Sequence, residues 1–191
     1  PFALAAHSFL SCKHLMNQMF NIVDGFGEAL DTLRVGGLAG VPTETVYGLA
    51  ADATNDAAVS KIFTAKGRPS FNPLICHVSD FEMAARFGVF SDTAQMLAGH
   101  FWPGPLTLVV PLQANSGIAA GVTAELDTIA LRQPTGVMAK LAAELGHPIA
   151  APSANSSGKI SPTTAQHVAD DLGERVDFIL DDGPCSVGVE S

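Results

Sequence analysis

Residues 55–78 read NDAAVSKIFTAKGRPSFNPLICHV and place a helix, a turn and a strand in direct succession. Asn55 followed by Asp56 is typical of a helix start, and apolar residues then recur at helical spacing as far as position 63. Gly67, with Pro69 close behind it, predicts the end of that helix. The apolar run that begins at Pro73 predicts a strand ending near residue 78. A helix that turns directly into a buried strand is the building unit of an α/β fold.

The rest of the chain repeats this alternation. Further helices are predicted over 24–35, 91–99 and 134–145 and after Asp80, and Ser161-Pro162 is predicted to cap and open a helix that runs to Val168. Strands are predicted over 38–41, 106–110, 128–131, 149–151 and 176–180, and residues 187–191 read as a strand cut short. We therefore expect one α/β domain over 21–191, truncated at its C-terminal end, with helices packed on a single twisted, open, mixed sheet. Residues 1–20 are interpreted as an N-terminal extension without the pattern of a signal peptide.

Composition excludes several classes of protein. The chain has 191 residues, of which 47% are hydrophobic and 15% are charged, so we expect a folded domain with a full core rather than a disordered chain. Its apolar runs fall short of the roughly 18 residues that a membrane span requires. The net charge of -9 argues against a broad nucleic-acid-binding face, although a local basic cleft stays open. The three cysteines are far apart and lack metal-binding spacing, which favours a reducing, cytoplasmic setting.

The densest positive charge in this acidic chain lies at Lys66, Gly67 and Arg68. Lysine supplies a compact charge and arginine a planar fork of donors, so the pair suits a phosphate or a carboxylate. An equally good interpretation is a solvated pair of cations that compensates the negative end of the helix dipole.

Two polar segments could supply the rest of a site. The loop 152–164 contains Ser153 and Asn155, whose hydroxyl and amide groups suit a polar ligand, and a helix capped by Ser161 would offer its first N–H groups to an anion. The alternative is a capped surface loop. Residues 42–49 read PTETVYGL and present Thr43 and Tyr47 after an apolar strand, where ligands gather in open α/β sheets. The alternative there is a hydrogen-bonded turn.

His77 and Arg132 each end a predicted strand. A strand-end arginine suits a carboxylate or phosphate but is also a common surface residue, and a histidine in an apolar strand is most often structural. The chain has no Walker A loop, no dinucleotide-binding glycine motif and no H-E-x-x-H zinc motif. Since no covalent nucleophile stands out, an enzyme built on these groups would work by positioning and charge stabilisation.

Taken together, the segments resemble the YrdC/Sua5 family, the threonylcarbamoyl-AMP synthases, from about residue 36 to the end of the chain. The family pattern K-x-R…S-x-N appears here as Lys66, Arg68, Ser153 and Asn155. The flanking segments P-T-E-T-V-Y-G-L, K-G-R-P-x-x-N-P-L, W-P-G-P-L-T, P-S-A-N-x-S-G and S-P-T occur in the same order. Several long motifs in one order make the resemblance specific.

The resemblance implies a YrdC-like (RibB-like) fold and a nucleotidyltransferase reaction. L-threonine, bicarbonate and ATP would give threonylcarbamoyl-AMP and pyrophosphate, with Mg²⁺ entering on the nucleotide rather than on protein ligands. The product would pass to tRNA threonylcarbamoyl-transferase proteins, which modify adenosine 37 of tRNAs that read ANN codons.

The resemblance also assigns roles to residues. Lys66 and Arg68 are expected to be catalytic and to neutralise the phosphates. The ATP site is expected to be completed by Ser153, Asn155 and Ser161. The threonine pocket is expected to contain Thr43, His77, Thr128, Arg132 and Ser191. Within it, Arg132 would face the substrate carboxylate, and Tyr47 would form part of the cleft wall.

Two other functions stay open at this point. The same fold could serve as an RNA-binding module that holds tRNA in a basic concave surface. It could also be the YrdC-like domain of a hydrogenase-maturation carbamoyltransferase, although the acylphosphatase-like and zinc-binding segments of those proteins do not occur in this chain.

Overall fold

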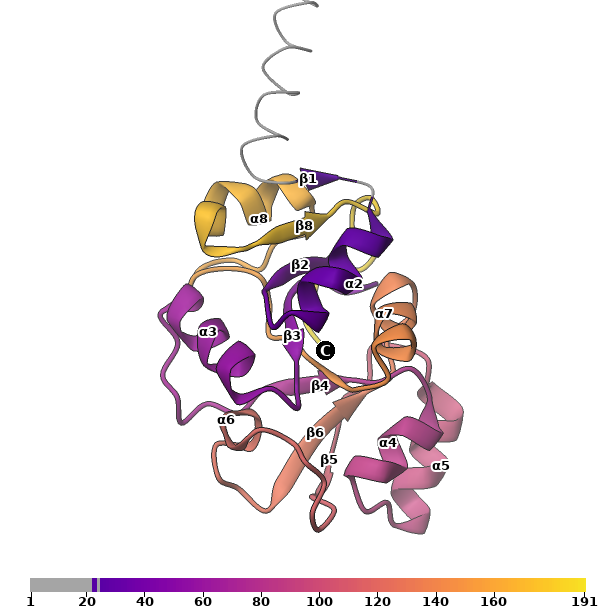
Figure 1. Ribbon diagram of the computed structural model, residues 1–191. Helices are drawn as coiled ribbons and strands as arrows, with labels where there is room; N and C mark the ends of the chain where they lie inside the picture. The colour runs from indigo at the N-terminus through magenta and orange to yellow at the C-terminus, as the bar shows by residue number, and fades with distance from the viewer. Residues whose placement is uncertain (1–21, 24) are drawn as a thin grey trace, which may run out of the picture.

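The computed structural model describes residues 22, 23 and 25–191, which form one mixed sheet with helices around it (Figure 1). The predicted N-terminal extension over 1–20 lies outside the described residues. The strands are β1 Ile22–Val23, β2 Ala39–Pro42, β3 Tyr47–Asp52, β4 Ile75–His77, β5 Leu108–Pro111, β6 Thr128–Arg132, β7 Ile149–Ala150 and β8 Phe178–Leu180. The helices are α2 Phe26–Arg34, α3 Asp56–Lys66, α4 Phe81–Phe87, α5 Asp92–Phe101, α6 Ala120–Thr123, α7 Val137–Leu145 and α8 Ala165–Leu172, followed by the 3₁₀ turn η1 Gly173–Arg175.

The strand order is β1-β8-β2-β3-β7-β4-β6-β5. The pairs β1/β8, β2/β8 and β4/β6 are parallel, whereas β2/β3, β3/β7, β4/β7 and β5/β6 are antiparallel. The expected open, mixed sheet with packed helices is therefore confirmed. Figure 1 shows β1 and β8 beside α8 at one end of the sheet and β5 beside α4 and α5 at the other, while the C-terminal end of the chain returns to the middle.

Local sequence signals set most helix ends as predicted. The side chain of Asn55 accepts the N–H of Ala58 at 3.1 Å and begins α3. Gly67 ends that helix in the left-handed region at φ +59°, a conformation that costs glycine little. Asp80 and Ser91 cap α4 and α5 in the same way as Asn55 caps α3.

The predicted helix from Ser161 to Val168 is wrong at its start. Helix α8 begins only after Thr164, whose side chain accepts the N–H three residues further on at 3.2 Å. The Pro162 carbonyl instead accepts the N–H of Tyr47 at 2.9 Å. Pairing with β3 therefore keeps this segment out of the helix, and Ser161 does not cap one.

The C-terminal segment also differs from its prediction, because residues 187–191 form no strand. Val187 and Gly188 donate their N–H groups to the carbonyls of Glu44 and Thr45, at 2.9 Å each. The tail is thus fastened to the turn between β2 and β3, and this fastening carries its last residues to the middle of the sheet.

Strand β3 is a central strand that the sequence analysis did not predict. It pairs with β2 on one side and β7 on the other, and its residues are almost wholly buried. A Cβ added at Gly48 would come within 3.1 Å of the Ala151 side chain. The absence of a side chain at Gly48 therefore allows the chain after β7 to lie against β3, where Ser153 forms a bridge with Gly48.

Among the described residues, no helix is both long and apolar enough to cross a membrane.

Candidate functional site

A pocket opens where β4 and β6 end. Because these strands are parallel and His77 pairs in register with Arg132, their C-terminal ends lie side by side. The remaining walls come from the turn between β2 and β3, the segment after α3, residues 151–153 and the C-terminal tail. Segments from the whole length of the domain thus meet at one edge of the sheet, the place where ligands gather in α/β folds.

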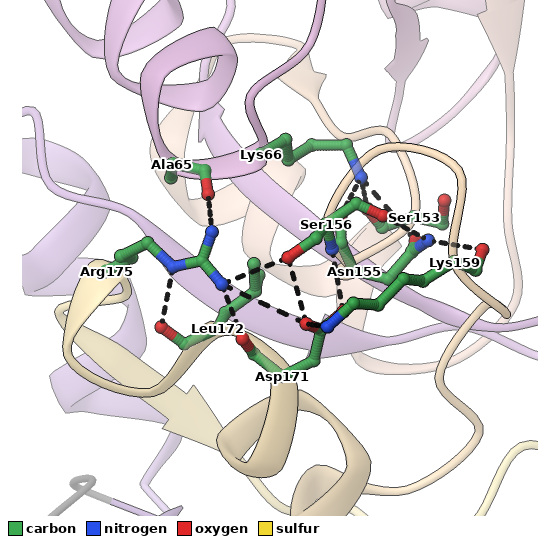
Figure 2. Close-up of polar contacts among 9 residues, drawn as sticks. All are labelled: Ala65, Lys66, Ser153, Asn155, Ser156, Lys159, Asp171, Leu172 and Arg175. Atoms are coloured by element: carbon green, nitrogen blue, oxygen red, sulfur yellow. Dashed lines mark hydrogen bonds and ion pairs between the residues drawn. The ribbon is translucent and has the colours of Figure 1, made fainter.

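The two polar clusters singled out in the sequence are in direct contact at this edge (Figure 2). The Lys66 Nζ atom donates hydrogen bonds to the backbone carbonyls of Ser153 and Asn155, which lie 87 and 89 residues away in the chain. The Asn155 Oδ1 atom lies 3.5 Å from the same ammonium group. Since Lys66 is only 3% exposed, its ammonium group replaces lost water contacts with protein oxygens.

Burial and the positive charge of Arg68 lower the pKa of Lys66 to about 8, against the opposite effect of Glu190 and Asp171. Lys66 therefore stays mostly protonated at neutral pH. It lies behind the pocket rather than in its wall, and Arg68 is the cation among the lining residues on that side. The Arg68 guanidinium donates to the Pro73 carbonyl at 3.1 Å.

Ser153 lines the pocket, whereas Asn155 shapes the loop beside it. The Asn155 Nδ2 atom donates to the carbonyls of Lys159 at 2.8 Å and Ser156 at 3.0 Å. Ser161 donates its hydroxyl to Glu190 of the tail. Because Ser161 does not begin a helix, the prediction of an anion site at such a helix start is wrong. Ser161 reaches the pocket only through its contact with Glu190.

Arg132 lies in a buried polar cluster at the other side of the pocket. Its Nη2 atom is 2.8 Å from Glu44 Oε1, with exposed side-chain fractions of 3% and 12%. Its Nη1 atom donates to Thr45 Oγ1 at 3.0 Å and its Nε atom to the Gly104 carbonyl at 3.2 Å. Arg132 therefore already has a carboxylate partner in the protein, and Glu44 also accepts the N–H of Thr135 at 3.2 Å.

Thr43 and His77 also reach the pocket. Thr43 Oγ1 donates to the Val46 carbonyl at 2.8 Å, so its hydroxyl closes the turn between β2 and β3. Burial and the nearby Arg132 lower the pKa of His77 to about 3, and the imidazole is therefore neutral at physiological pH. Ser191 lines the pocket and lies 2.9 Å from the Thr107 hydroxyl, measured between the two Oγ atoms.

Two predicted site residues lie elsewhere. Thr128 begins β6, at the end opposite Arg132, and the strand rise over four residue steps places the two about 13 Å apart. Tyr47 is completely buried and donates its hydroxyl to the Gly183 carbonyl at 2.8 Å. Burial and the neighbouring Asp181 raise its pKa. Tyr47 anchors the start of the tail and does not form part of the cleft wall.

Sequence reasoning missed several charged groups around the pocket. Glu44 was noticed only as part of its segment and not as the partner of Arg132. Lys159 ends the serine loop, residues 153–159, and Asp171 and Arg175 contact this loop from outside (Figure 2). Asp171 and Arg175 are four residues apart, a spacing that predicts a contact between their side chains if the segment is helical. Nothing in the sequence indicated which loop this pair would contact.

Similarity to known proteins identifies the family of this chain. A family model named for Sua5, YciO and YrdC, with the description "Telomere recombination", matches residues 31–191. The chain belongs to this family. It is 49% identical over 166 residues to a threonylcarbamoyl-AMP synthase from Bacillus subtilis, an alignment that covers 86% of this chain and 48% of that protein. It is 34% identical over 163 residues to a threonylcarbamoyl-AMP synthase from Vibrio vulnificus, covering 83% of this chain and 87% of that protein.

A solved member of the family has the same fold. The crystal structure of Pyrococcus abyssi Sua5 complexed with L-threonine superposes with a TM-score of 0.82 at 48% identity, over 87% of this chain and 49% of that one. The chain spans about half the length of the first curated relatives it matches, with 48% and 47% of their sequences covered.

Proposed function

We propose that this domain is an L-threonylcarbamoyladenylate synthase, which converts L-threonine, bicarbonate and ATP into threonylcarbamoyl-AMP and pyrophosphate. One observation supports this most strongly. The Lys66–Arg68 turn and the Ser153–Asn155 loop meet at a pocket whose other side carries Thr43, His77 and Arg132. The cavity thus offers a cation on each side, Arg68 on one and Arg132 on the other, which suits a polyphosphate placed beside an amino acid.

In this proposal, the chemistry needs no covalent intermediate with the protein. The amine of threonine and bicarbonate form a carbamate with loss of water. A carbamate oxygen then attacks the α-phosphorus of ATP and displaces pyrophosphate. The domain contributes by holding the reactants in line and by stabilising the charge that develops on the phosphates.

Arg68 is the cation placed to contact the phosphates, because it lines the pocket. Lys66 supports the phosphate side with its charge and fixes the loop that carries Ser153. On the threonine side, the neutral imidazole of His77 lets it accept or donate a hydrogen bond without adding charge. Arg132, buried against Glu44, offers a guanidinium whose orientation is already fixed.

Mg²⁺ would enter with ATP. The described residues offer no group of three His, Cys, Asp or Glu side chains that could hold a metal ion, and oxygen ligands from the phosphates are those that Mg²⁺ prefers. The ion would neutralise phosphate charge during the transfer.

We also propose that the product is used in the cytoplasm by tRNA threonylcarbamoyl-transferase proteins. The names of the relatives specify threonylcarbamoyl-AMP as their product, and the free thiols of Cys76 and Cys185 fit a reducing compartment. The RNA-binding alternative would need a cleft lined by Lys61, Lys66, Arg68 and Arg132, and it is disfavoured because two of these four cations are buried. Lys66 and Arg132 are each 3% exposed, so they do not present a basic surface to a phosphate backbone.

The proposal is tested by calorimetric titration of the longest available form of the protein with L-threonine and then with ATP. Pyrophosphate release is then followed with each of the three reactants omitted in turn. We expect threonine to bind and pyrophosphate to appear only when all three reactants are present. Failure to bind threonine, or pyrophosphate release that does not depend on threonine and bicarbonate, would disprove the proposed function.

A further inference from the structure

A network of charged and polar groups lies against the serine loop (Figure 2), and its members Asp171 and Arg175 are not among the residues that line the pocket. Asp171, near the end of α8, accepts the backbone N–H of Ser156 at 2.8 Å and the Ser156 hydroxyl at 2.9 Å. The same carboxylate accepts a hydrogen bond from Lys159 Nζ at 2.6 Å. One side chain thus holds both ends of the turn formed by residues 156–159.

Arg175 connects this loop to helix α3. Its Nη1 atom donates to the Ala65 carbonyl at 2.6 Å, and its Nη2 atom donates to the Ser156 hydroxyl at 3.0 Å. The Ala65 carbonyl belongs to the last turn of α3, where the residue four positions on is Pro69, which has no N–H to offer. The guanidinium therefore satisfies a carbonyl that the helix itself leaves without a donor.

A backbone contact completes the junction. The N–H of Ser157 donates to the Lys66 carbonyl at 2.8 Å, so the loop and Arg175 together cap the C-terminal end of α3. That end carries Lys66 and leads directly to Arg68, while the loop carries Ser153. Neither Asp171 nor Arg175 lines the pocket, so both act on it only through these neighbours.

We propose that Asp171 and Arg175 are positioning residues that clamp the 153–159 loop against the end of α3 and thereby set the geometry of the ATP side of the pocket. The inference rests on the proposed function, because it assigns ATP to that side. Charge supports the clamp. Burial alone would raise the pKa of Asp171, but hydrogen bonds from Lys159 and Ser156 outweigh it and lower that pKa to about 2, so the carboxylate stays ionised across the physiological range.

The clamp predicts a selective loss of nucleotide binding. Asp171→Ala should raise the Kd for ATP about tenfold, the change expected from loss of roughly one charge-assisted hydrogen bond, while the Kd for L-threonine stays within about twofold. Asp171→Asn keeps an acceptor for the Ser156 N–H but loses the charge that faces Lys159, so its effect should be intermediate. The matched control is Asp170→Ala, which removes the neighbouring exposed carboxylate that faces Gln166 instead.

Amide hydrogen exchange supplies a readout that does not require ATP to bind. In Asp171→Ala the amides of residues 153–159 should exchange faster than in the wild type and in the Asp170→Ala control, with protection in β3 unchanged. A wild-type protein that binds no ATP would overturn the proposed function, and exchange alone would then decide whether the clamp exists. Unchanged exchange in the loop would overturn the inference. Equal losses of ATP and threonine binding would also overturn it, since they would indicate general destabilisation.

Discussion

The buried pair of Glu44 and Arg132 gives the sharpest prediction on the threonine side of the pocket. Glu44→Gln removes the carboxylate charge and leaves one acceptor oxygen, whereas Glu44 uses Oε1 for Arg132 and Oε2 for the N–H of Thr135. Removing one partner of a buried ion pair costs about 3–5 kcal/mol, because the other charge is left uncompensated. Arg132 is only 3% exposed, so water cannot take over the role of Glu44. Since glutamine still offers one acceptor, we expect the free energy of unfolding to fall by the lower limit of this range, about 3 kcal/mol.

For a domain of this size, such a loss corresponds to a decrease in Tm of about 6–12 °C. The assay is thermal unfolding of Glu44→Gln, of Arg132→Met and of the double variant, followed by circular dichroism. In the double variant neither charge remains, so it should be less destabilised than the sum of the two single variants. Additive losses would show that the pair does not interact as the 2.8 Å contact requires. If the free energy of unfolding of Glu44→Gln were within about 1 kcal/mol of that of the wild type, the expectation that an unpaired, buried Arg132 is costly would be refuted.

Three further predictions concern the two sides of the pocket. The pKa of Lys66 is about 8, and its protonated form attracts phosphate, so ATP affinity should fall about tenfold between pH 7 and pH 9. A Kd for ATP that calorimetry finds unchanged over that range would contradict this. Arg68→Ala should raise the Kd for ATP at least about tenfold and abolish pyrophosphate release while changing Tm little, because Arg68 lines the pocket; normal turnover would exclude Arg68 from the mechanism. Thr128→Ala should leave threonine affinity within about twofold of wild type, since Thr128 lies at the opposite end of β6, and a large loss measured by the same titration would restore it to the pocket.

The sequence was sufficient to predict the parts of the fold that local chemistry controls. Helix ends marked by Asn55, Asp80 and Ser91 are confirmed, because a side-chain cap acts within three residues of itself. Strand β3 was not predicted because its glycine and alanines have low strand propensity. It is a strand because both neighbours pair with it, and at Gly48 the close approach of Ala151 leaves no room for a side chain.

The errors at the site have the same origin. Ser161-Pro162 has the local signature of a helix start, but the pairing of Pro162 with Tyr47 outweighs it, and Thr164 provides a competing cap three residues later. The convergence of Lys66 with Ser153 was correctly expected from the family motifs. The clamp formed by Asp171 and Arg175 was not predicted. It depends on a contact between a distant loop and the end of α3, and the spacing of apolar residues in the sequence carries no information about that contact.

The position of β8 between β1 and β2 has a consequence for how the protein is made. Strand β2 ends at Pro42, but one of its two hydrogen-bonding partners, β8, begins only at Phe178. During synthesis, one edge of β2 therefore has no native neighbour until nearly the whole domain has left the ribosome. Such an edge is open to pairing with other chains, and contacts between segments so far apart form late and slowly. The nascent chain should accordingly be most prone to aggregation just before β8 emerges.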